Sequence, residues 1–136
     1  MARSALKVCS RCRLEKTKTG FHRNWHSPGG LSAVCKECKC NYKRGWHLNK
    51  AYGLTNADYA QMLLEQKGVC LICKRPETRV SNKSGSVQPL CVDHNHKTNR
   101  VRGLLCNRCN RSIGLLEKYD DALELSKRIV AYLEAH

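Results

Sequence analysis

Four Cys-x-x-Cys pairs constrain this sequence more than any other feature. They account for eight of the ten cysteines: Cys9/Cys12, Cys35/Cys38, Cys70/Cys73 and Cys106/Cys109. Pairs with this spacing suit tetrahedral zinc, at about 2.3 Å per sulfur, better than a disulfide framework. Aromatic residues make up only 6% of the 136 residues, and small modules with so thin a core depend on metals or disulfides to fold. We therefore expect two structural zinc ions, with Cys40 and Cys91 left free.

The context of the cysteines favours metal over disulfides. The opening residues, MARSALKVCSRC, contain no apolar run of the length found in signal peptides, and no stretch approaches the roughly 20 apolar residues that span a bilayer. These features predict a protein of a reducing cytoplasm, that of the host if a phage encodes the chain, where thiols bind metal more often than they oxidise. The alternative is a secreted domain held together by disulfides.

The net charge of +14 is unevenly distributed. Residues 1–52 hold 12 lysines and arginines against 2 acidic residues, whereas residues 53–136 hold 13 against 9. A charge of this sign and size predicts a polyanionic partner, with the first 52 residues providing most of the non-specific attraction. An anionic membrane would require an amphipathic basic helix with large apolar residues opposite the charges, and the sequence has no strong one.

Two parts of the chain are expected, residues 1–52 and residues 53–136. The first would be a four-cysteine zinc module with a 22-residue insert between its cysteine pairs, followed by a basic helix over residues 39–52, KCNYKRGWHLNKAY. We expect Gly45 to interrupt or weaken this helix. Its aromatic residues Tyr42, Trp46 and Tyr52 are expected to pack in the core or between the two parts, rather than to stack on nucleic acid.

The second part is expected to combine helices and short strands, which makes the whole an α+β protein. Thr55 and Asp58 form a capping-box pattern at the start of a helix that Gly68 would stop. The segments PLCVDH and RVRGLL are predicted as two strands joined by the turn NHKTNR. Residues from Cys106 are expected to be partly helical, and a last amphipathic helix would begin at Asp120 or Asp121.

The 32-residue insert between Cys73 and Cys106 carries chemistry that the cysteines do not use. Four cysteines leave a zinc ion no open position, so Asp93, His94, His96 and Asn110 must have another role. A carboxylate and an amide oxygen suit Mg²⁺ or Mn²⁺, and a neutral imidazole beside them can accept a proton from water near pH 7. Alternatively, Asp93 and Asn110 cap turns while the histidines contact phosphate. The residue types alone leave both readings open.

The motifs GVCLIC, CVDHNHKTNRVRGLLC and CNRCN, taken together, resemble the recombination endonuclease VII family of phage enzymes, which belong to the HNH or ββα-metal nucleases. The resemblance runs from about Gly53 to Leu116. It implies a zinc-stabilised ββα-metal core in which Asp93 and Asn110 hold a catalytic divalent metal, Mg²⁺ or Mn²⁺. His94 would then be the general base, and His96 would take the second imidazole position, toward water or phosphate. Such sites leave 5′-phosphate and 3′-hydroxyl ends.

The resemblance has one local departure, because Ile113 stands where the best-known member has an acidic residue, three positions after the asparagine. The segment ahead of the core resembles the additional zinc module found before such cores in phage proteins. Four basic residues lie where the DNA backbone would pass and are candidates for contact with its phosphates: Lys97, Arg100, Arg102 and Arg108.

The sequence thus predicts a metal-dependent DNA endonuclease of the endonuclease VII type. One alternative is a non-catalytic zinc protein that binds DNA and regulates transcription, which would not need Asp93, His94 and Asn110 together. Another is a homing or restriction-type HNH nuclease with the same chemistry. The sequence is compatible with a monomer or a homodimer.

Overall fold

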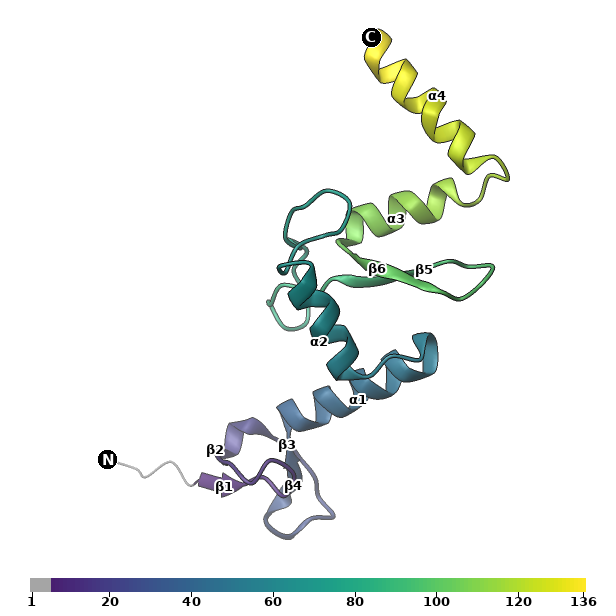
Figure 1. Ribbon diagram of the computed structural model, residues 1–136. Coiled ribbons are helices and arrows are strands. Elements are labelled where there is room, and N and C mark those ends of the chain that lie inside the picture. Colours follow the sequence, from purple (N-terminus) through teal and green to yellow (C-terminus); the bar gives the residue numbers. More distant parts are fainter. Residues whose placement is uncertain (1–5) are drawn as a thin grey trace. The chain divides into compact units, whose positions relative to one another are not determined.

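The computed structural model describes residues 6–136 and shows an α+β chain (Figure 1). It divides into two compact units, Met1–Asp58 and Tyr59–His136. The secondary structure of the described residues comprises three separate two-stranded antiparallel sheets and four α-helices, with two short 3-10 turns. No helix within residues 6–136 is long and apolar enough to cross a membrane.

The first unit contains two small hairpins and one long helix. Its elements are β1 (Leu6–Val8), β2 (Glu15–Thr17), β3 (Phe21–Arg23), β4 (Leu31–Cys35) and α1 (Lys36–Tyr52). The pairing is β1 with β2 and β3 with β4. Phe21 is buried together with Cys9 and Cys35, so a single aromatic ring and the cysteines form the core of this unit. This composition agrees with the expectation that cysteine ligands replace a conventional core.

Helix α1 is continuous, and the predicted interruption at Gly45 is wrong. Gly45 lies inside the 17-residue helix, and a Cβ atom added to it would lie 2.8 Å from Nδ2 of Asn56. That amide donates a hydrogen bond of 3.0 Å to the carbonyl oxygen of Asn41. Gly45 therefore allows the side chain of Asn56 to approach the helix closely. The hydrogen bonds of the surrounding helix compensate for the low helix propensity of glycine.

Two of the three aromatic residues of α1 do not pack in the core as expected. Tyr42 is 58% exposed and Trp46 is 56% exposed, whereas Tyr52 is half-buried. Leu48 is the residue of α1 that is buried. The side of α1 that carries Tyr42 and Trp46 is thus a surface of the protein.

Helix α2 (Asn56–Glu65) begins with the capping box that the sequence predicted. The carboxylate of Asp58 accepts hydrogen bonds from the backbone N–H and the hydroxyl of Thr55, at 2.7 and 2.8 Å, and Thr55 Oγ1 accepts one from the backbone N–H of Asp58 at 3.1 Å. Gly68 follows the helix with φ of +74° and donates its N–H to the carbonyl of Leu63. Helix α2 ends at Glu65, and the first left-handed residue after it is Lys67, with φ of +55°, whose N–H donates to the carbonyl of Leu64. Gly68 is therefore the second residue of this C-cap, close to the stop that the sequence predicted.

The second unit is built around a hairpin followed by a helix, a ββα arrangement (Figure 1). Its elements after α2 are β5 (Cys91–His94), β6 (Val101–Leu105), α3 (Asn107–Leu116) and α4 (Ala122–Ala135). The two predicted strands are confirmed, and α3 packs against both of them. The buried core comprises Tyr59, Leu90, Val92, Leu104 and Leu105. The hydroxyl of Tyr59 donates to the carbonyl of Leu90 at 2.8 Å, which ties α2 to the segment that enters β5.

The side chain of Gln66 forms hydrogen bonds with the outer edge of strand β6. Its Oε1 accepts a hydrogen bond from the N–H of Leu104 at 2.8 Å, and its Nε2 donates to the carbonyl oxygens of Leu104 and Val69. The carbonyl of Leu104 also accepts the backbone N–H of Leu71 at 3.0 Å, so both backbone groups of Leu104 on the outer side of the two-stranded sheet are paired. Gln66 therefore acts as a short substitute for a third strand next to the residues that form the candidate site.

Candidate functional site

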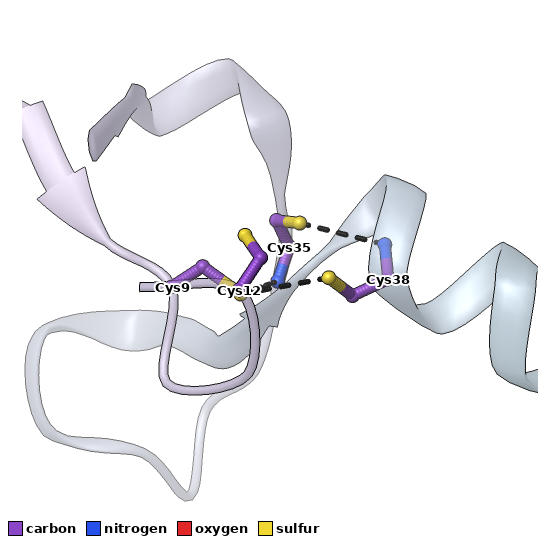
Figure 2. Close-up of side chains that lie close together, drawn as sticks. All are labelled: Cys9, Cys12, Cys35 and Cys38. Carbon is purple, nitrogen blue, oxygen red and sulfur yellow. Dashed lines mark hydrogen bonds between the residues drawn. The ribbon is translucent and has the colours of Figure 1, made fainter. Parts of the chain in front are cut away.

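Eight cysteines form two clusters, and these are the eight that the sequence predicted. Within each cluster the four Sγ atoms lie within 4.8 Å of one another; the clusters are Cys9, Cys12, Cys35, Cys38 and Cys70, Cys73, Cys106, Cys109. Figure 2 shows the first cluster, in which the side chains of one pair, Cys9 and Cys12, point toward those of the pair at the start of α1, Cys35 and Cys38. Four converging thiols at this separation fit tetrahedral zinc. Cys40 and Cys91 lie outside both clusters.

Backbone amides in both clusters favour ionised thiols. The backbone N–H groups of Cys35 and Arg11 donate to Sγ of Cys9, and hydrogen bonds from the Cys35 and Cys12 backbone are the largest causes that lower the pKa of Cys9 to about 6. For Cys70, burial raises the pKa but backbone hydrogen bonds from Cys106 and Cys73 outweigh it, which gives about 7. The same thiols disfavour a second ionisation without a metal: the hydrogen bond with Cys35 raises the pKa of Cys38 to about 12, and burial raises that of Cys109 to about 12. Thiolates are the metal-binding form, so one thiol of each cluster is prepared for a cation, and a bound cation would favour ionisation of the others.

The second cluster also begins helix α3. Cys106 is the N-cap residue, and its Sγ accepts the N–H of Cys109 at 3.5 Å. Glu77 reinforces this start, because its Oε2 accepts the N–H of Asn107 at 2.6 Å while its Oε1 accepts those of Thr78 and Arg79. Helix α3 carries Asn110, so a cysteine cluster and a carboxylate together fix the helix on which this candidate residue lies.

Neutralising Glu77 is expected to make the protein less stable at neutral pH only. Burial raises the pKa of Glu77, but hydrogen bonds from the backbone of Arg79, Asn107 and Thr78 outweigh it, and the net pKa is lowered. A carboxyl with a lowered folded-state pKa stabilises the fold above its ordinary pKa, and this contribution is lost as pH falls through the lowered value. Glu77→Gln should lower the free energy of unfolding by about 1 kcal/mol at pH 7, a modest effect because the group is partly exposed to solvent.

This difference is measured by urea unfolding of the two proteins side by side from pH 7 downward, so that acid effects on the thiols affect both equally. The two curves should converge below the ordinary carboxyl pKa of about 4.3. Equal stability at pH 7 would show that Glu77 does not stabilise the start of α3 by its charge.

A β-bulge in β6 lies opposite the candidate catalytic residues of β5. In the β5–β6 ladder Asp93 lies opposite Gly103 and His94 lies opposite Val101, so Arg102 is the extra residue of β6. Adjacent residues of a regular strand point to opposite faces, and the bulge changes that alternation in β6, at Arg102. Asp93 is buried, with 9% of its surface exposed, and His94 is half-buried.

Arg102 forms a fork on the Asp93 carboxylate. Its Nε lies 2.7 Å from Oδ2 and its Nη2 lies 3.0 Å from Oδ1, while Nη2 also donates to the carbonyl of His94 at 3.2 Å. On its other side Nη1 donates to Oε1 of Glu117 at 2.5 Å. The hydrogen bonds to Asp93 and then Glu117 raise the already high pKa of Arg102. Arg102 was expected to contact phosphate, but its guanidinium is committed to these carboxylates.

Glu117 is the residue of this site that the sequence analysis missed. It follows α3 directly, seven residues after Asn110, so it lies two turns further along the same side of the helix. Its Oε2 lies 3.7 Å from Nε2 of His96 and is buried, with no hydrogen-bond partner in the described part of the chain. Helical periodicity was the signal that could have found Glu117. Ile113 lacks the acidic group expected at its position, and Glu117, four residues later on the same side of the helix, carries one.

The two histidines of the run lie close together at the edge of this site. The ring centroids of His94 and His96 are 4.7 Å apart with planes inclined at 48°. His94 belongs to β5, and His96 follows in the turn, where Oδ1 of Asn95 accepts the N–H groups of Lys97 and Thr98. Asn95 therefore shapes the turn and is not free for chemistry. The other basic candidates, Lys97, Arg100 and Arg108, are exposed.

The ββα unit carries oxygen ligands of the type that a hard divalent cation takes. Asp93 on β5 has a carboxylate and Asn110 on α3 has an amide, and β5 and α3 pack against each other. The buried Oε2 of Glu117, whose carboxylate also pairs with Arg102, is a further oxygen of the unit. Within residues 6–136, three or more His, Cys, Asp or Glu side chains converge only in the two four-cysteine clusters. A cation between Asp93 and Asn110 would therefore keep several waters, as Mg²⁺ does.

Replacement of Arg102 tests whether it holds Asp93 in place. The side chain of Arg102 is 35% exposed and that of Asp93 is 12% exposed, so removing the guanidinium would leave a nearly buried charge without a partner. Arg102→Gln should lower the free energy of unfolding by about 2–3 kcal/mol. The double variant Arg102→Gln, Asp93→Asn should recover part of this loss in urea unfolding, because the unpaired charge is also removed.

Arg100→Gln is the matched control, since Arg100 is an exposed arginine two residues away in the same hairpin, and it should change stability by less than about 0.5 kcal/mol. If Arg102→Gln and Arg100→Gln had equal effects, the Arg102–Asp93 pair would not organise this site.

Comparisons with known proteins find a family model and two phage proteins that match this chain. The sequence model of the recombination endonuclease VII family matches residues 45–135, about two thirds of the chain. The Gene 59 protein of Mycobacterium phage L5 is 41% identical over 83 residues, and that of Mycobacterium phage D29 is 40% identical over 82 residues. Each match covers 60% of this chain but 44% of the relative, so the chain matches less than half the length of these proteins.

One solved structure is similar at low identity, the ββα-Me type II restriction endonuclease Hpy99I. The comparison gives a TM-score of 0.39 and 23% identity, and it covers 96% of this chain and 65% of that one. The family match extends from within α1 to the end of α4 and includes the β5–β6 hairpin, α3 and the second cysteine cluster. The chain belongs to the recombination endonuclease VII family.

Proposed function

We propose that this protein is a metal-dependent DNA endonuclease. The observation that carries the proposal is the bulged β5–β6 hairpin, in which Arg102 binds both the buried carboxylate of Asp93 and the backbone carbonyl of His94, within a chain of the endonuclease VII family. A purely structural hairpin gains nothing from a buried carboxylate beside an imidazole, because the desolvation of the charge must be offset by a dedicated arginine. An active site gains a fixed geometry from the same arrangement.

His94 is the proposed general base. It is half-buried, its backbone carbonyl is fixed by Arg102, and its ring lies beside that of His96. A neutral imidazole in this position can accept the proton of a water molecule that attacks the phosphorus in line with the scissile bond. His96, which is more exposed and lies 3.7 Å from the Glu117 carboxylate, is proposed to contact the phosphate or the attacking water.

Asp93 and Asn110 are the proposed holders of a divalent cation, Mg²⁺ or Mn²⁺. Such a cation supplies stabilisation of the negative charge that develops on the phosphate and on the departing 3′ oxygen. Asp93 keeps lone pairs for this purpose, because each of its oxygens accepts only one of the hydrogen bonds from Arg102. Arg102 positions the carboxylate, and Glu117 positions Arg102 from its other side.

The two cysteine clusters are proposed to bind structural zinc. Four thiolates complete a tetrahedral site and leave no position for a substrate, so neither ion takes part in the chemistry. The cluster that begins α3 sets the position of Asn110 relative to β5. The cluster that begins α1 holds the more basic part of the chain together. Residues 1–52 and 53–136 are proposed as the corresponding zinc module and nuclease core.

DNA is the proposed substrate, attracted by the net charge of +14. Lys97 and Arg100 lie in the exposed β5–β6 turn and Arg108 lies exposed on α3, where they are proposed to contact the phosphates of the strand that is cut.

The chemistry of the ends tests the proposed reaction. The zinc-loaded chain is incubated with supercoiled plasmid and Mg²⁺, and nicked products are treated with DNA ligase. Hydrolysis that expels the 3′ oxygen leaves a 5′-phosphate and a 3′-hydroxyl, so ligase should reseal the nicks without prior treatment. Nicks that ligase seals only after a kinase or a phosphatase has acted would contradict the proposed direction of attack.

A further inference from the structure

The aromatic face of α1 is a second surface with a chemical character of its own. We define it by Tyr42 and Trp46, which are four residues apart and therefore neighbours on one side of the helix. More than half of each residue is exposed. Large rings that contribute nothing to the core of a small unit, when set side by side in this way, form a surface suited to binding.

A cation lies against each of these two rings. The guanidinium carbon of Arg11 is 4.9 Å from the centroid of the Tyr42 ring, and Nζ of Lys50 is 4.8 Å from that of the Trp46 ring. Arg11 lies between Cys9 and Cys12, and its N–H donates to Sγ of Cys9, so the first cysteine cluster sets its position. The face thus alternates flat rings and positive charges over two turns of the helix.

A groove of about 630 Å³ runs along this face. Besides the two rings and Arg11, its lining includes the side-chain amides of Asn41, Asn49 and Asn56. Gly45 lies between them, and the absence of a side chain there lets the Asn56 amide approach the helix. Amide groups provide both hydrogen-bond donors and acceptors. The edges of nucleobases carry donors and acceptors as well, so these amides are suited to bind them next to the flat rings.

The charge around the groove is almost entirely positive. Helix α1 carries five basic residues against one acidic residue: Lys36, Lys39, Lys43, Arg44 and Lys50 against Glu37. The Glu37 carboxylate is paired with Lys16, so its charge is compensated. Lys39, Lys43 and Lys50 are separated by four and seven residues and share one side of α1, next to the two rings. This strip could follow a phosphate backbone while bases lie on the rings.

We propose that the aromatic face of α1 binds single-stranded DNA, with bases stacked on Tyr42 and Trp46 and phosphates along Lys39, Lys43 and Lys50. The combination of a positive strip and exposed aromatic rings is that of single-strand binding surfaces. Duplex DNA would use only the strip, since its bases are already stacked on one another. The choice of DNA over RNA rests on the proposed function, because the proposed substrate of the same chain is DNA.

Fluorescence of Trp46 reports binding directly. Trp25 and Trp46 are the two tryptophans, so Trp25→Phe leaves Trp46 as the single reporter. In this background the zinc-loaded full-length chain is titrated, without Mg²⁺ or Mn²⁺, with a single-stranded oligonucleotide, the corresponding duplex and a single-stranded RNA of equal length. We expect the DNA single strand to quench Trp46 and to bind more tightly than the other two. Tyr42→Leu should weaken this binding about 5- to 100-fold, the range for loss of one stacked base.

Tyr42→Phe keeps the ring and should bind like the parent, whereas Tyr132→Leu removes an equally exposed tyrosine from α4 and should have no effect. Unchanged affinity of Tyr42→Leu, or tighter binding of the duplex or of the RNA, would overturn the proposal. Cleavage plays no part in this titration. A chain that binds the single strand through Trp46 but cuts no DNA would refute the proposed function alone, and a chain that cuts DNA without Trp46 quenching would refute this inference alone.

Discussion

His94→Ala is expected to reduce the single-turnover rate of DNA cleavage by about 10²- to 10⁴-fold, the usual effect of removing a positioned general base. The zinc content and the fold should persist, because His94 belongs to neither cysteine cluster and contacts Arg102 through its backbone carbonyl, which alanine retains. DNA affinity should change little, since a neutral imidazole offers at most one modest contact. Rates at saturating DNA, with affinity measured separately, distinguish the two effects.

The matched control for this variant is His26→Ala, which removes an exposed histidine from the β3–β4 loop of the first unit. It should cleave at the wild-type rate. His96→Ala should fall between the two, because His96 is more exposed and lies on the outer side of the site. A His94→Ala protein that cut DNA as fast as wild type would remove His94 from the mechanism.

Disruption of the second cysteine cluster is expected to have the largest effect on stability. Cys106→Ser removes a thiolate that is also the N-cap of α3. Binding of a structural zinc contributes apparent free energies of about 10–16 kcal/mol, which is as large as the whole stability of a small domain. The variant should retain one zinc per chain instead of two, lose the helical signal of its second unit and fail to cleave DNA.

Cys40→Ser is the control, because Cys40 is exposed on α1 and lies outside both clusters, and it should keep two zinc ions and full activity. Metal analysis and circular dichroism of the three proteins test the account. Fewer than two zinc ions in a folded wild-type chain, or disulfides detected by mass spectrometry of the native protein, would contradict it.

The features that sequence predicted well were those fixed by local spacing. Two Cys-x-x-Cys pairs per cluster determine which thiols converge, almost regardless of the insert between them, because the ligand geometry brings the chain ends together. The capping box at Thr55 and Asp58 is likewise formed within four residues. The turn segment NHKTNR between the two short runs PLCVDH and RVRGLL was sufficient to locate β5 and β6.

The features that sequence predicted poorly depend on contacts between distant segments. Gly45 had the appearance of a helix breaker, and only the Asn56 amide packed against it explains its place inside α1. Tyr42 and Trp46 were expected to be covered, because aromatic residues usually are, but a unit whose core is made of cysteines has no interior large enough for them.

Arg102 shows the same limitation within the candidate site. An arginine near a predicted phosphate path is normally a phosphate contact, and no local pattern reveals that a bulge turns this side chain onto Asp93. Glu117 was overlooked because the expected acid was sought at Ile113, one turn too early on the same side of α3. The roles of Arg102 and Glu117 depend on the register of the β5–β6 hairpin and on the packing of α3 against it.

Plasmid cleavage by the zinc-loaded wild-type chain, with and without Mg²⁺ or Mn²⁺, tests the central claim most directly. The account predicts that supercoiled DNA is converted to nicked or linear forms only when one of these cations is added, and that the His94→Ala protein at the same concentration leaves the plasmid intact over the same time. If the folded wild-type chain cut neither supercoiled plasmid, nicked circle nor a four-way junction with either cation, it would not be an endonuclease. A zinc protein that binds DNA without cutting it would then be the better description.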